Sequence, residues 1–303
     1  MADNKKVTVF GASGQIGRNL LAKLAKKDFE IIAITRNPYE NLHLKVCAQP
    51  GQLELKKLDF TNLSELMEDS DFIINLIGIL YENKKQKFNL LHNKFPDYLS
   101  KIAKEKKIKK FIHISALGVH HDSKSNYLIS KLNGEKAVQK NLQNNCIVRP
   151  SIVFGKDDNF FNLFAKLVNL FPIIPLVGIN TKFQPTYVGD VSDAIIKILE
   201  EERMKESIYE LGGPNIHSFK ELIEMLSKVM GKKRFIISVP DIVARIQAKI
   251  FQLFPKPLLT EDQLEILKFD NICSGKFSGY NDLAIYPKSV ETILSTYMFS
   301  KKN

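Results

Sequence analysis

The stretch that decides the fold is "KVTVFGASGQIGRNLLAKLAKK", residues 6–27. A β-branched apolar run comes first, a glycine-rich turn follows, and leucines then recur at helical spacing. The pattern G-x-x-G-x-x-G is set by Gly11, Gly14 and Gly17. Glycine permits a tight turn and a close approach of the backbone to a pyrophosphate, which the helix N-terminus attracts. We therefore predict a nucleotide-binding strand–turn–helix unit; the alternative is a purely structural turn.

The rest of the chain continues this alternation of strands and helices. Alternating elements imply a parallel sheet with right-handed crossovers, so we predict an α/β fold with a doubly wound, Rossmann-type parallel sheet and a smaller α+β C-terminal lobe. Residues 1–155 should form the nucleotide-binding domain and residues 156–303 the lobe, which is interleaved with the sheet near residues 183–213. Later strands are expected at residues 30–37, 53–60, 71–78, 109–117 and 145–155, with a helix at about residues 88–106.

The chain of 303 residues carries 44 Lys and Arg against 33 Asp and Glu, a formal net charge of +11. Such an excess can serve nucleic acid or an anionic surface. The lysines are scattered in short clusters, however, and no aromatic-interleaved RNA-binding motif accompanies them. We expect no nucleic-acid partner, whereas an acidic protein or anionic lipid head groups remain open.

Three cysteines, Cys47, Cys146 and Cys273, stand far apart in the sequence. An odd and dispersed set argues against a disulfide framework and against a metal site, and it favours a reducing compartment. The N-terminus enters an apolar strand so early that we expect no signal or transit peptide. We also expect no membrane span, because no uninterrupted apolar run reaches about 18 residues.

The residue after the second strand decides between the two nicotinamide cofactors. An acid there would bind the ribose 2′-hydroxyl, but this chain has Arg36, and no acid is nearby. A guanidinium suits the 2′-phosphate of NADP, and Arg18 could assist it. The alternative is an exposed arginine at a strand end. Ligands sit at the carboxyl ends of parallel strands, which predicts Asp59 and Phe60 near the adenine and residues 76–78 along the ribose.

A tyrosine and a lysine, Tyr127 and Lys131, stand four residues apart and would share one face of a helix. In an enzyme, Lys131 would bind the nicotinamide ribose and lower the pKa of the phenol by its charge. Tyr127 would then transfer the substrate proton while Ser115 polarised the carbonyl. The alternative keeps the contacts of both side chains with the ribose but involves no chemistry.

A further helix is expected at residues 241–254, with Val243, Ile246, Ile250 and Phe254 near one face. We favour a core-facing stripe for these side chains. A docking or membrane-surface face is the alternative.

These pieces, in this order, resemble the short-chain dehydrogenase/reductase superfamily in its extended or atypical branches. The matching motifs are "GASGQIG", Asp59, "NLIG", "ISALG", Tyr127-x-x-x-Lys131, "VRPSIVFG" and "FQPTYVGDVSDAI". The stretches "YLISKLNGEKAV", "PLVG" and "LTEDQLEILKFDNICS" narrow the resemblance to the family of NADPH-binding accessory subunits of respiratory complex I and their bacterial relatives. The last stretch, residues 259–274, weighs most, because it lies outside the cofactor motifs.

This resemblance implies an NADP(H)-binding subunit whose cofactor is structural and lies off the main electron path. It implies peripheral-arm subunits of complex I as partners, possible contact with the membrane surface, and a place on the cytoplasmic face of a bacterial inner membrane. No turnover of its own is expected; the alternative is a free-standing NADP-dependent reductase or epimerase. The candidate catalytic residues are Tyr127, Lys131 and Ser115. The candidate cofactor contacts are Gly11, Ser13, Gly14, Gln15, Ile16, Gly17, Arg18, Arg36, Asp59, Phe60, Leu76, Ile77, Gly78, Ser115, Tyr127, Lys131 and Pro150.

Overall fold

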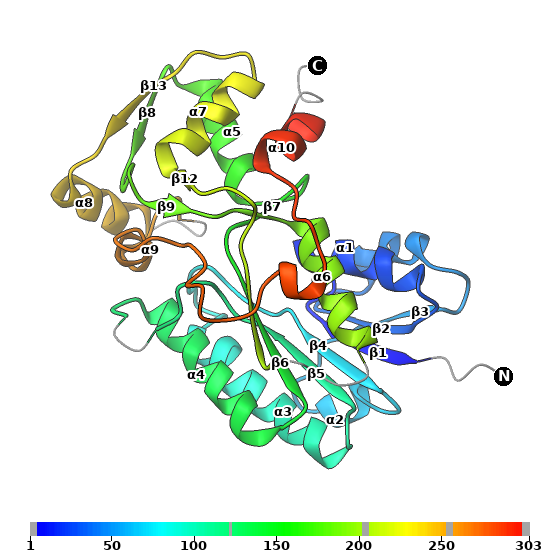
Figure 1. The fold of residues 1–303 in the computed structure, drawn as a ribbon. Helices are drawn as coiled ribbons and strands as arrows, with labels where there is room; N and C mark the ends of the chain where they lie inside the picture. The colour runs from blue at the N-terminus through cyan, green and yellow to red at the C-terminus, as the bar shows by residue number, and fades with distance from the viewer. Residues whose placement is uncertain (1–4, 121–122, 202–205, 253–256, 299–303) are drawn as a thin grey trace.

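The computed structural model describes residues 5–120, 123–201, 206–252 and 257–298. Within these residues the centre of the molecule is a seven-stranded parallel sheet with the order β11-β6-β5-β4-β1-β2-β3 (Figure 1). The predicted doubly wound sheet is therefore confirmed. The strand order reverses between β1 and β4, which creates a crevice at the carboxyl edge of the sheet. The strands are β1 (Lys6–Phe10), β2 (Glu30–Thr35), β3 (Leu53–Lys57), β4 (Phe72–Asn75), β5 (Lys110–Ile114), β6 (Asn145–Pro150) and β11 (Ile208–Leu211).

Helices cover both faces of this sheet (Figure 1). On one face lie α1 (Gln15–Ala25) and α6 (Val188–Glu200), and on the other lie α2 (Leu63–Leu66), α3 (Phe95–Glu105) and α4 (Asn126–Asn141). The regular leucine spacing after the glycine turn explains the position of α1, because Leu20, Leu21 and Leu24 are fully buried against the sheet. The packed sheet and helices thus position the crevice at the carboxyl edge.

The C-terminal lobe has a hydrophobic cluster of its own, formed chiefly by α5 (Phe160–Leu170), α7 (Phe219–Val229) and α10 (Val290–Met298). A capping box formed by Ser218 and Glu221 starts α7. The remaining elements are η1 (Tyr39–Cys47), η2 (Asn89–Lys94), β7 (Val153–Phe154), β8 (Ile173–Leu176), β9 (Lys182–Phe183), β10 (Thr186–Tyr187), β12 (His217–Ser218), β13 (Phe235–Ser238), α8 (Asp241–Phe251), α9 (Glu261–Ile266) and η3 (Asn281–Leu283).

The favoured interpretation of the helix at 241–254 was wrong. In α8 the side chains of Val243, Ile246 and Ile250 are 45%, 57% and 52% exposed. The buried face is formed instead by Ala244 and Ala248, whose small side chains let α8 approach α9 closely. The bulkier apolar residues consequently face outward, and Phe254 lies outside the described residues.

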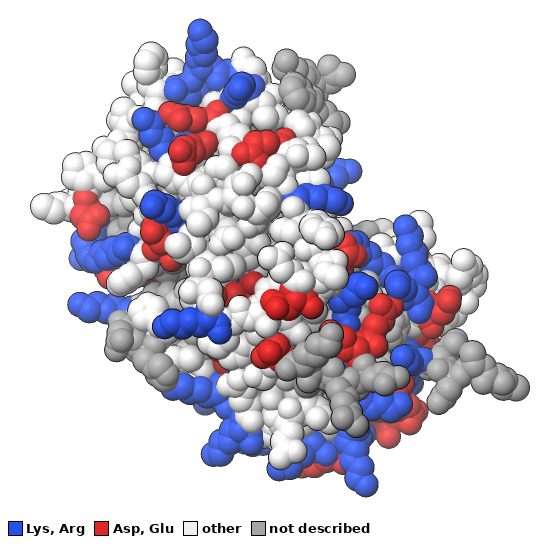
Figure 2. Space-filling model, in the orientation of Figure 1, with Lys and Arg blue, Asp and Glu red and all other residues white. Residues whose placement is uncertain are grey.

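Surface charge is mixed on the face drawn in Figure 2, where Lys and Arg lie among Asp and Glu over most of the area. In the described part of the chain, no helix is both long enough and apolar enough to cross a bilayer.

Candidate cofactor site

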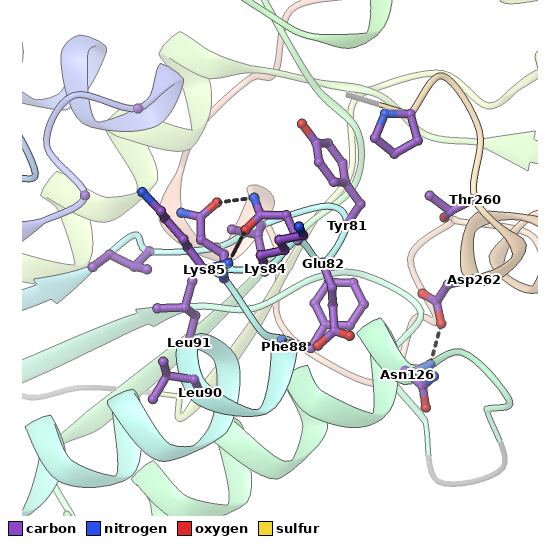
Figure 3. A pocket seen from close by; sticks show the side chains of 18 of the residues that line it. Tyr81, Glu82, Lys84, Lys85, Phe88, Leu90, Leu91, Asn126, Thr260 and Asp262 are labelled. Atoms are coloured by element: carbon purple, nitrogen blue, oxygen red, sulfur yellow. Dashed lines mark hydrogen bonds between the residues drawn. The ribbon is translucent and has the colours of Figure 1, made fainter. Parts of the chain in front are cut away.

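A cleft of about 1500 Å³ opens at the carboxyl edge of the sheet, between the nucleotide-binding turn and the C-terminal lobe. The wall formed by the segments that follow strands β1–β4 contains eight of the predicted cofactor contacts: Gly11, Ser13, Gly14, Arg36, Phe60, Leu76, Ile77 and Gly78. The other nine do not line it: Gln15, Ile16, Gly17, Arg18, Asp59, Ser115, Tyr127, Lys131 and Pro150. Figure 3 shows its outer part, where Lys84 and Lys85 come from the loop after β4 and Asp262 comes from α9.

The glycine turn is packed so closely that side chains cannot enter it. Gly11 has a φ of +83°, and a Cβ there would lie 3.1 Å from the backbone nitrogen of Ile77. A Cβ on Gly17 would lie 2.4 Å from the carbonyl oxygen of Ala12. Gly14 donates its N–H to the Gly11 carbonyl at 3.0 Å and is the N-cap of α1. With no acid in the first turn of α1, this cradle fits a pyrophosphate.

The two candidate arginines differ in their surroundings. Arg36 is exposed at the end of β2, lines the cleft, and makes no hydrogen bond or ion pair with any described residue. Arg18 instead donates to the Ser13 carbonyl at 3.0 Å and lies 3.4 Å from a carboxylate oxygen of Asp157. Of these two arginines, Arg36 is therefore the one that remains available to a phosphate.

At the end of β3 the ring of Phe60, and not the carboxylate of Asp59, lines the cleft. Asp59 accepts hydrogen bonds from the amide and hydroxyl of Thr61 at 2.8 and 2.6 Å, and these bonds lower the pKa of its carboxyl group. Phe60 packs edge-on against Phe95, with 5.4 Å between ring centroids. An adenine placed here would meet an aromatic ring.

Tyr127 and Lys131 both project from α4 towards the loop that follows β4. Lys131 donates from Nζ to the carbonyl of Ile114 at 3.0 Å, and its ammonium would lie 3.2 Å from a Cβ built on Gly78. The Tyr127 ring packs edge-on against Phe88 and His92, with centroids 5.7 and 5.4 Å apart. Gly78 lines the cleft, so the pair lies directly behind its wall.

The expected lowering of the phenol pKa is not found. Burial raises the pKa of Tyr127 to about 12, and the nearby Asp262 carboxylate adds to the rise because it opposes a second negative charge. Burial also lowers the pKa of Lys131 to about 8, although Glu135 counteracts this. The sequence spacing had suggested proximity of the two groups, but it contained no information on desolvation or on Asp262.

His92, which the sequence did not single out, connects this loop to α4. The N–H of Ile79 donates to its Nε2 at 3.0 Å, so the proton sits on Nδ1, which donates to the Ser130 hydroxyl at 2.9 Å. The hydroxyl of Ser130 donates in turn to the carbonyl of Tyr127 at 2.7 Å. Burial, with a contribution from Lys131, lowers the pKa of His92 to about 2 and keeps the ring neutral.

A buried network of three charged side chains, Glu135, Arg149 and Glu210, begins one turn of α4 after Lys131 and is called the ionic ladder below. Arg149 on β6 binds both carboxylate oxygens of Glu135, at 2.9 and 2.6 Å, and its other nitrogen is 3.8 Å from Glu210 on β11. Glu210 also accepts the amide and hydroxyl of Ser274, at 2.6 and 2.8 Å. Glu135 and Arg149 are 14 residues apart, and Ser274 lies 64 residues beyond Glu210, so local sequence patterns could not reveal the ladder.

Asp262, in the stretch 259–274, reaches the first turn of α4. Its carboxylate accepts the Ser125 hydroxyl at 2.8 Å, the Asn126 amide at 2.5 Å and the Tyr127 amide at 3.3 Å (Figure 3 shows the Asn126 bond). The same stretch contributes Asn271, which donates to the carbonyl of Leu117 at 3.0 Å. The stretch therefore supports the loop after β5 as well as α4.

Two orphaned polar atoms mark the inner end of the site. The Ser115 hydroxyl and Nε2 of His113 are buried without a hydrogen-bond partner among the described residues. Pro150 closes β6, where its carbonyl accepts the amide of Leu117 at 2.9 Å. A free buried hydroxyl after β5, a glycine turn after β1 and an unpaired arginine after β2 all follow the carboxyl ends of strands of one sheet, which fits a dinucleotide that lies across this edge.

Residues 5–234 match the RmlD substrate binding domain family. An Arabidopsis thaliana protein, NADH dehydrogenase [ubiquinone] 1 alpha subcomplex subunit 9, is 31% identical over 300 residues, which cover 94% of this chain and 75% of that protein. The mouse subunit of the same name is 30% identical over 291 residues, covering 94% and 77%. This chain belongs to both families.

Membership of the alpha subcomplex subunit 9 family confirms the narrower resemblance drawn from the sequence. Because 94% of the chain is covered, the similarity extends well into the C-terminal lobe. Among solved structures, an NADPH-dependent quinone oxidoreductase from Escherichia coli complexed with NADPH superposes with a TM-score of 0.76 at 14% identity, covering 97% of this chain and 99% of that one. That likeness concerns the fold alone.

Proposed function

We propose that this protein is an accessory subunit of NADH:ubiquinone oxidoreductase that holds NADP(H) as a structural cofactor. The observation that carries the proposal is the family membership, at 30–31% identity over 94% of the chain, together with the role of residues 259–274. This stretch lies outside the cofactor motifs, and yet it supplies the carboxylate that caps α4. Residues 259–274 and the helix that carries Tyr127 and Lys131 are therefore parts of one connected site.

The residues present fit a 2′-phosphorylated dinucleotide. The Gly11–Gly17 turn would receive the pyrophosphate, Phe60 would face the adenine, and Arg36 would bind the 2′-phosphate bidentately. Ser115, Tyr127 and Lys131 would approach the nicotinamide ribose from the inner side of the wall. When bound, the nicotinamide supplies hydride-transfer chemistry.

Three features support retention of the cofactor without turnover. The Tyr127 phenol is a poor acid, since burial and the Asp262 carboxylate raise its pKa to about 12. Lys131 already donates to the backbone of β5, at 3.0 Å. His92 is kept neutral and links the loop after β4 to α4. The Tyr127 phenol and the His92 ring are therefore not poised to move a proton at neutral pH, and the Lys131 ammonium, whose pKa is lowered to about 8, is held by the backbone of β5.

The proposed partners are peripheral-arm subunits of the complex, with the C-terminal lobe as the docking region. The outward side chains of α8 and the nearby Phe235, 77% exposed, supply an apolar face. Residues 228–252 contain six Lys and Arg against one Asp, which is compatible with contact at an anionic membrane surface. For a bacterial protein this would be the cytoplasmic face of the inner membrane.

The test is purification of the tagged protein from its own host in mild detergent, beside an equally tagged unrelated protein. Subunits of the complex should co-purify, and acid extraction should release NADP(H) in about one equivalent per protein. Recovery of a monomer that carries no other subunit would refute the proposal.

A second function, a free-standing NADP-dependent reductase or epimerase, is favoured by one observation. Tyr127 and Lys131 retain the four-residue spacing on one helix, and the unpartnered Ser115 hydroxyl lies at the end of the adjacent strand. Oxidation of NADPH by the isolated monomer with a small carbonyl or quinone substrate would select this function. Its absence across such substrates would count for the structural role.

A further inference from the structure

We infer that Asp262 is a positioning residue of the cofactor site, which from the C-terminal lobe fixes the start of the helix that carries Tyr127 and Lys131. The inference rests on the proposed binding of NADP(H) and adds the residue through which the lobe controls it. Asp262 touches no reacting atom; it acts through α4.

The first observation is the set of bonds at the start of α4. An isolated helix leaves its first amides without partners, and a capping side chain normally comes from the residue just before the helix. Here Ser125 accepts from the Leu128 amide at 3.3 Å, while Asp262, 136 residues from Asn126, takes the amides of Asn126 and Tyr127. Asp262 also accepts the Ser125 hydroxyl. One distant carboxylate therefore completes the cap and adds a favourable charge at the positive end of the helix.

The second observation is that α4 is held again, further along, by the same stretch. Ser274 binds Glu210, and Glu210 faces Arg149, which binds Glu135 one turn after Lys131. The two anchors lie on either side of Lys131. The ammonium is thereby fixed against Gly78, at the wall of the cleft.

The third observation is the position of α9 itself. Thr260, Asp262 and Glu265 line the cleft, and Glu265 binds Arg245 of α8 at 2.8 Å. Helix α9 therefore closes the cleft on one side and holds α4 on the other. Loss of the Asp262 carboxylate frees the first turn of α4 and lowers the affinity for the cofactor by weakening the contacts of Tyr127 and Lys131.

The experiment is a titration with NADPH, followed by its nicotinamide fluorescence, of the full-length wild type and of three variants. Asp262→Ala should weaken binding about tenfold, in line with loss of a helix cap, and should change the emission of the bound cofactor. Asp262→Asn keeps one acceptor oxygen, so its affinity for NADPH should lie between those of the wild type and Asp262→Ala. Glu261→Gln is the matched control: it removes the same charge from the same helix and cleft, but Glu261 bonds to no described residue, so affinity should stay within about twofold.

The outcomes separate this inference from the proposed function. Wild type that binds NADPH no better than the Asp262 variants overturns the inference alone, whereas wild type that does not bind NADPH overturns both. Hydrogen exchange on the unmodified protein covers the case in which Asp262→Ala fails to fold. NADPH should slow exchange of the amides of residues 126–128, and unchanged exchange there would also overturn the inference.

Discussion

The two ends of the cleft are built in opposite ways. At the phosphate end, Arg36 presents an unpaired guanidinium to the cleft, and Gly11, Ser13 and Gly14 line it at the N-terminus of α1. At the nicotinamide end, Lys131, His92 and the start of α4 have their hydrogen bonds filled by other parts of the protein. Groups left free are ready for a ligand, whereas groups already paired contribute to the fold. The difference supports the proposal that the first end binds the cofactor, whereas the second end mainly supports the fold.

The largest expected effect comes from the buried ladder of the supporting end. Arg149→Leu leaves Glu135 and Glu210 buried without their cation, which should lower the free energy of unfolding by about 3–5 kcal/mol. Chemical denaturation of the wild type and the variant measures this difference.

The matched control is a partly exposed ion pair on the far side of the sheet. Lys23 lies 2.6 Å from Asp193, with side chains 29% and 48% exposed. Lys23→Leu should cost about 1 kcal/mol or less, because water screens this pair. Equal costs for the two variants would contradict the assignment of the ladder to the fold.

The binding end is tested by Arg36→Asp. Replacing the free guanidinium by a carboxylate should weaken NADPH about 30- to 100-fold relative to NADH, because a charge-assisted bond to the 2′-phosphate is lost and a repulsion added. Competitive titrations with both nucleotides measure the ratio. Stability should remain close to that of the wild type, in contrast to Arg149→Leu.

Lys26→Asp supplies the control for net charge, since Lys26 is exposed at the other end of α1 from the glycine turn. It should leave the ratio of the two affinities unchanged. If Lys26→Asp shifts that ratio as far as Arg36→Asp does, the specificity reflects overall charge and not a local contact.

The pH dependence of stability tests the supporting end with a smaller expected effect than Arg149→Leu. In the folded protein burial lowers the pKa of His92 to about 2 and that of His113 to about 3, from 6.5. The unfolded chain therefore binds more protons below about pH 6.5, and stability should fall there by up to about 1.4 kcal/mol per pH unit for each histidine. Denaturation midpoints measured between pH 7 and pH 5 give the slope.

His92→Gln should remove about half of that slope, whatever it does to stability at pH 7. His43→Gln is the matched control, because His43 is exposed in η1 and should leave the slope intact. An unchanged slope in His92→Gln would mean that other groups govern the acid sensitivity.

The smallest effect is expected for Tyr127→Phe. The phenol hydroxyl makes no hydrogen bond to a described residue, so stability should change by less than about 0.5 kcal/mol and NADPH affinity by less than about threefold. Assembly of the complex should be intact in a host carrying the variant. Loss of an NADPH-dependent turnover with the cofactor still bound would instead make Tyr127 catalytic.

Local patterns predicted the strand, the glycine turn and the helix at the phosphate end. Strand, glycine turn and helix follow one another within residues 6–27, and Arg36 follows the next strand directly, so short-range sequence contained the whole arrangement. Gly11 and Gly17 could be recognised because the required close contacts are properties of the turn itself. The fold class followed for the same reason, since alternation of elements is also visible locally.

The supporting end could not be predicted, because its contacts join distant parts of the chain. Nothing in the sequence next to Asp262, in "TEDQ", or next to His92 indicates the distant groups that these side chains contact. The interpretation of helix α8 was wrong for a related reason. Its pattern predicted an apolar face, but whether that face is buried depends on tertiary packing. The alanines at 244 and 248, not the larger side chains, turned out to be inside.

The long reach of Asp262 also has a consequence for biogenesis. During synthesis the N-terminal segments emerge first, so the glycine turn and Arg36 are complete long before residue 262 leaves the ribosome. Until then α4 lacks the distant carboxylate that caps it. The two ends of the cleft thus mature at different times. On the proposed binding mode, the groups for the phosphates are therefore complete before α9 has been made, whereas the cap of the helix that carries Tyr127 and Lys131 is complete only afterwards.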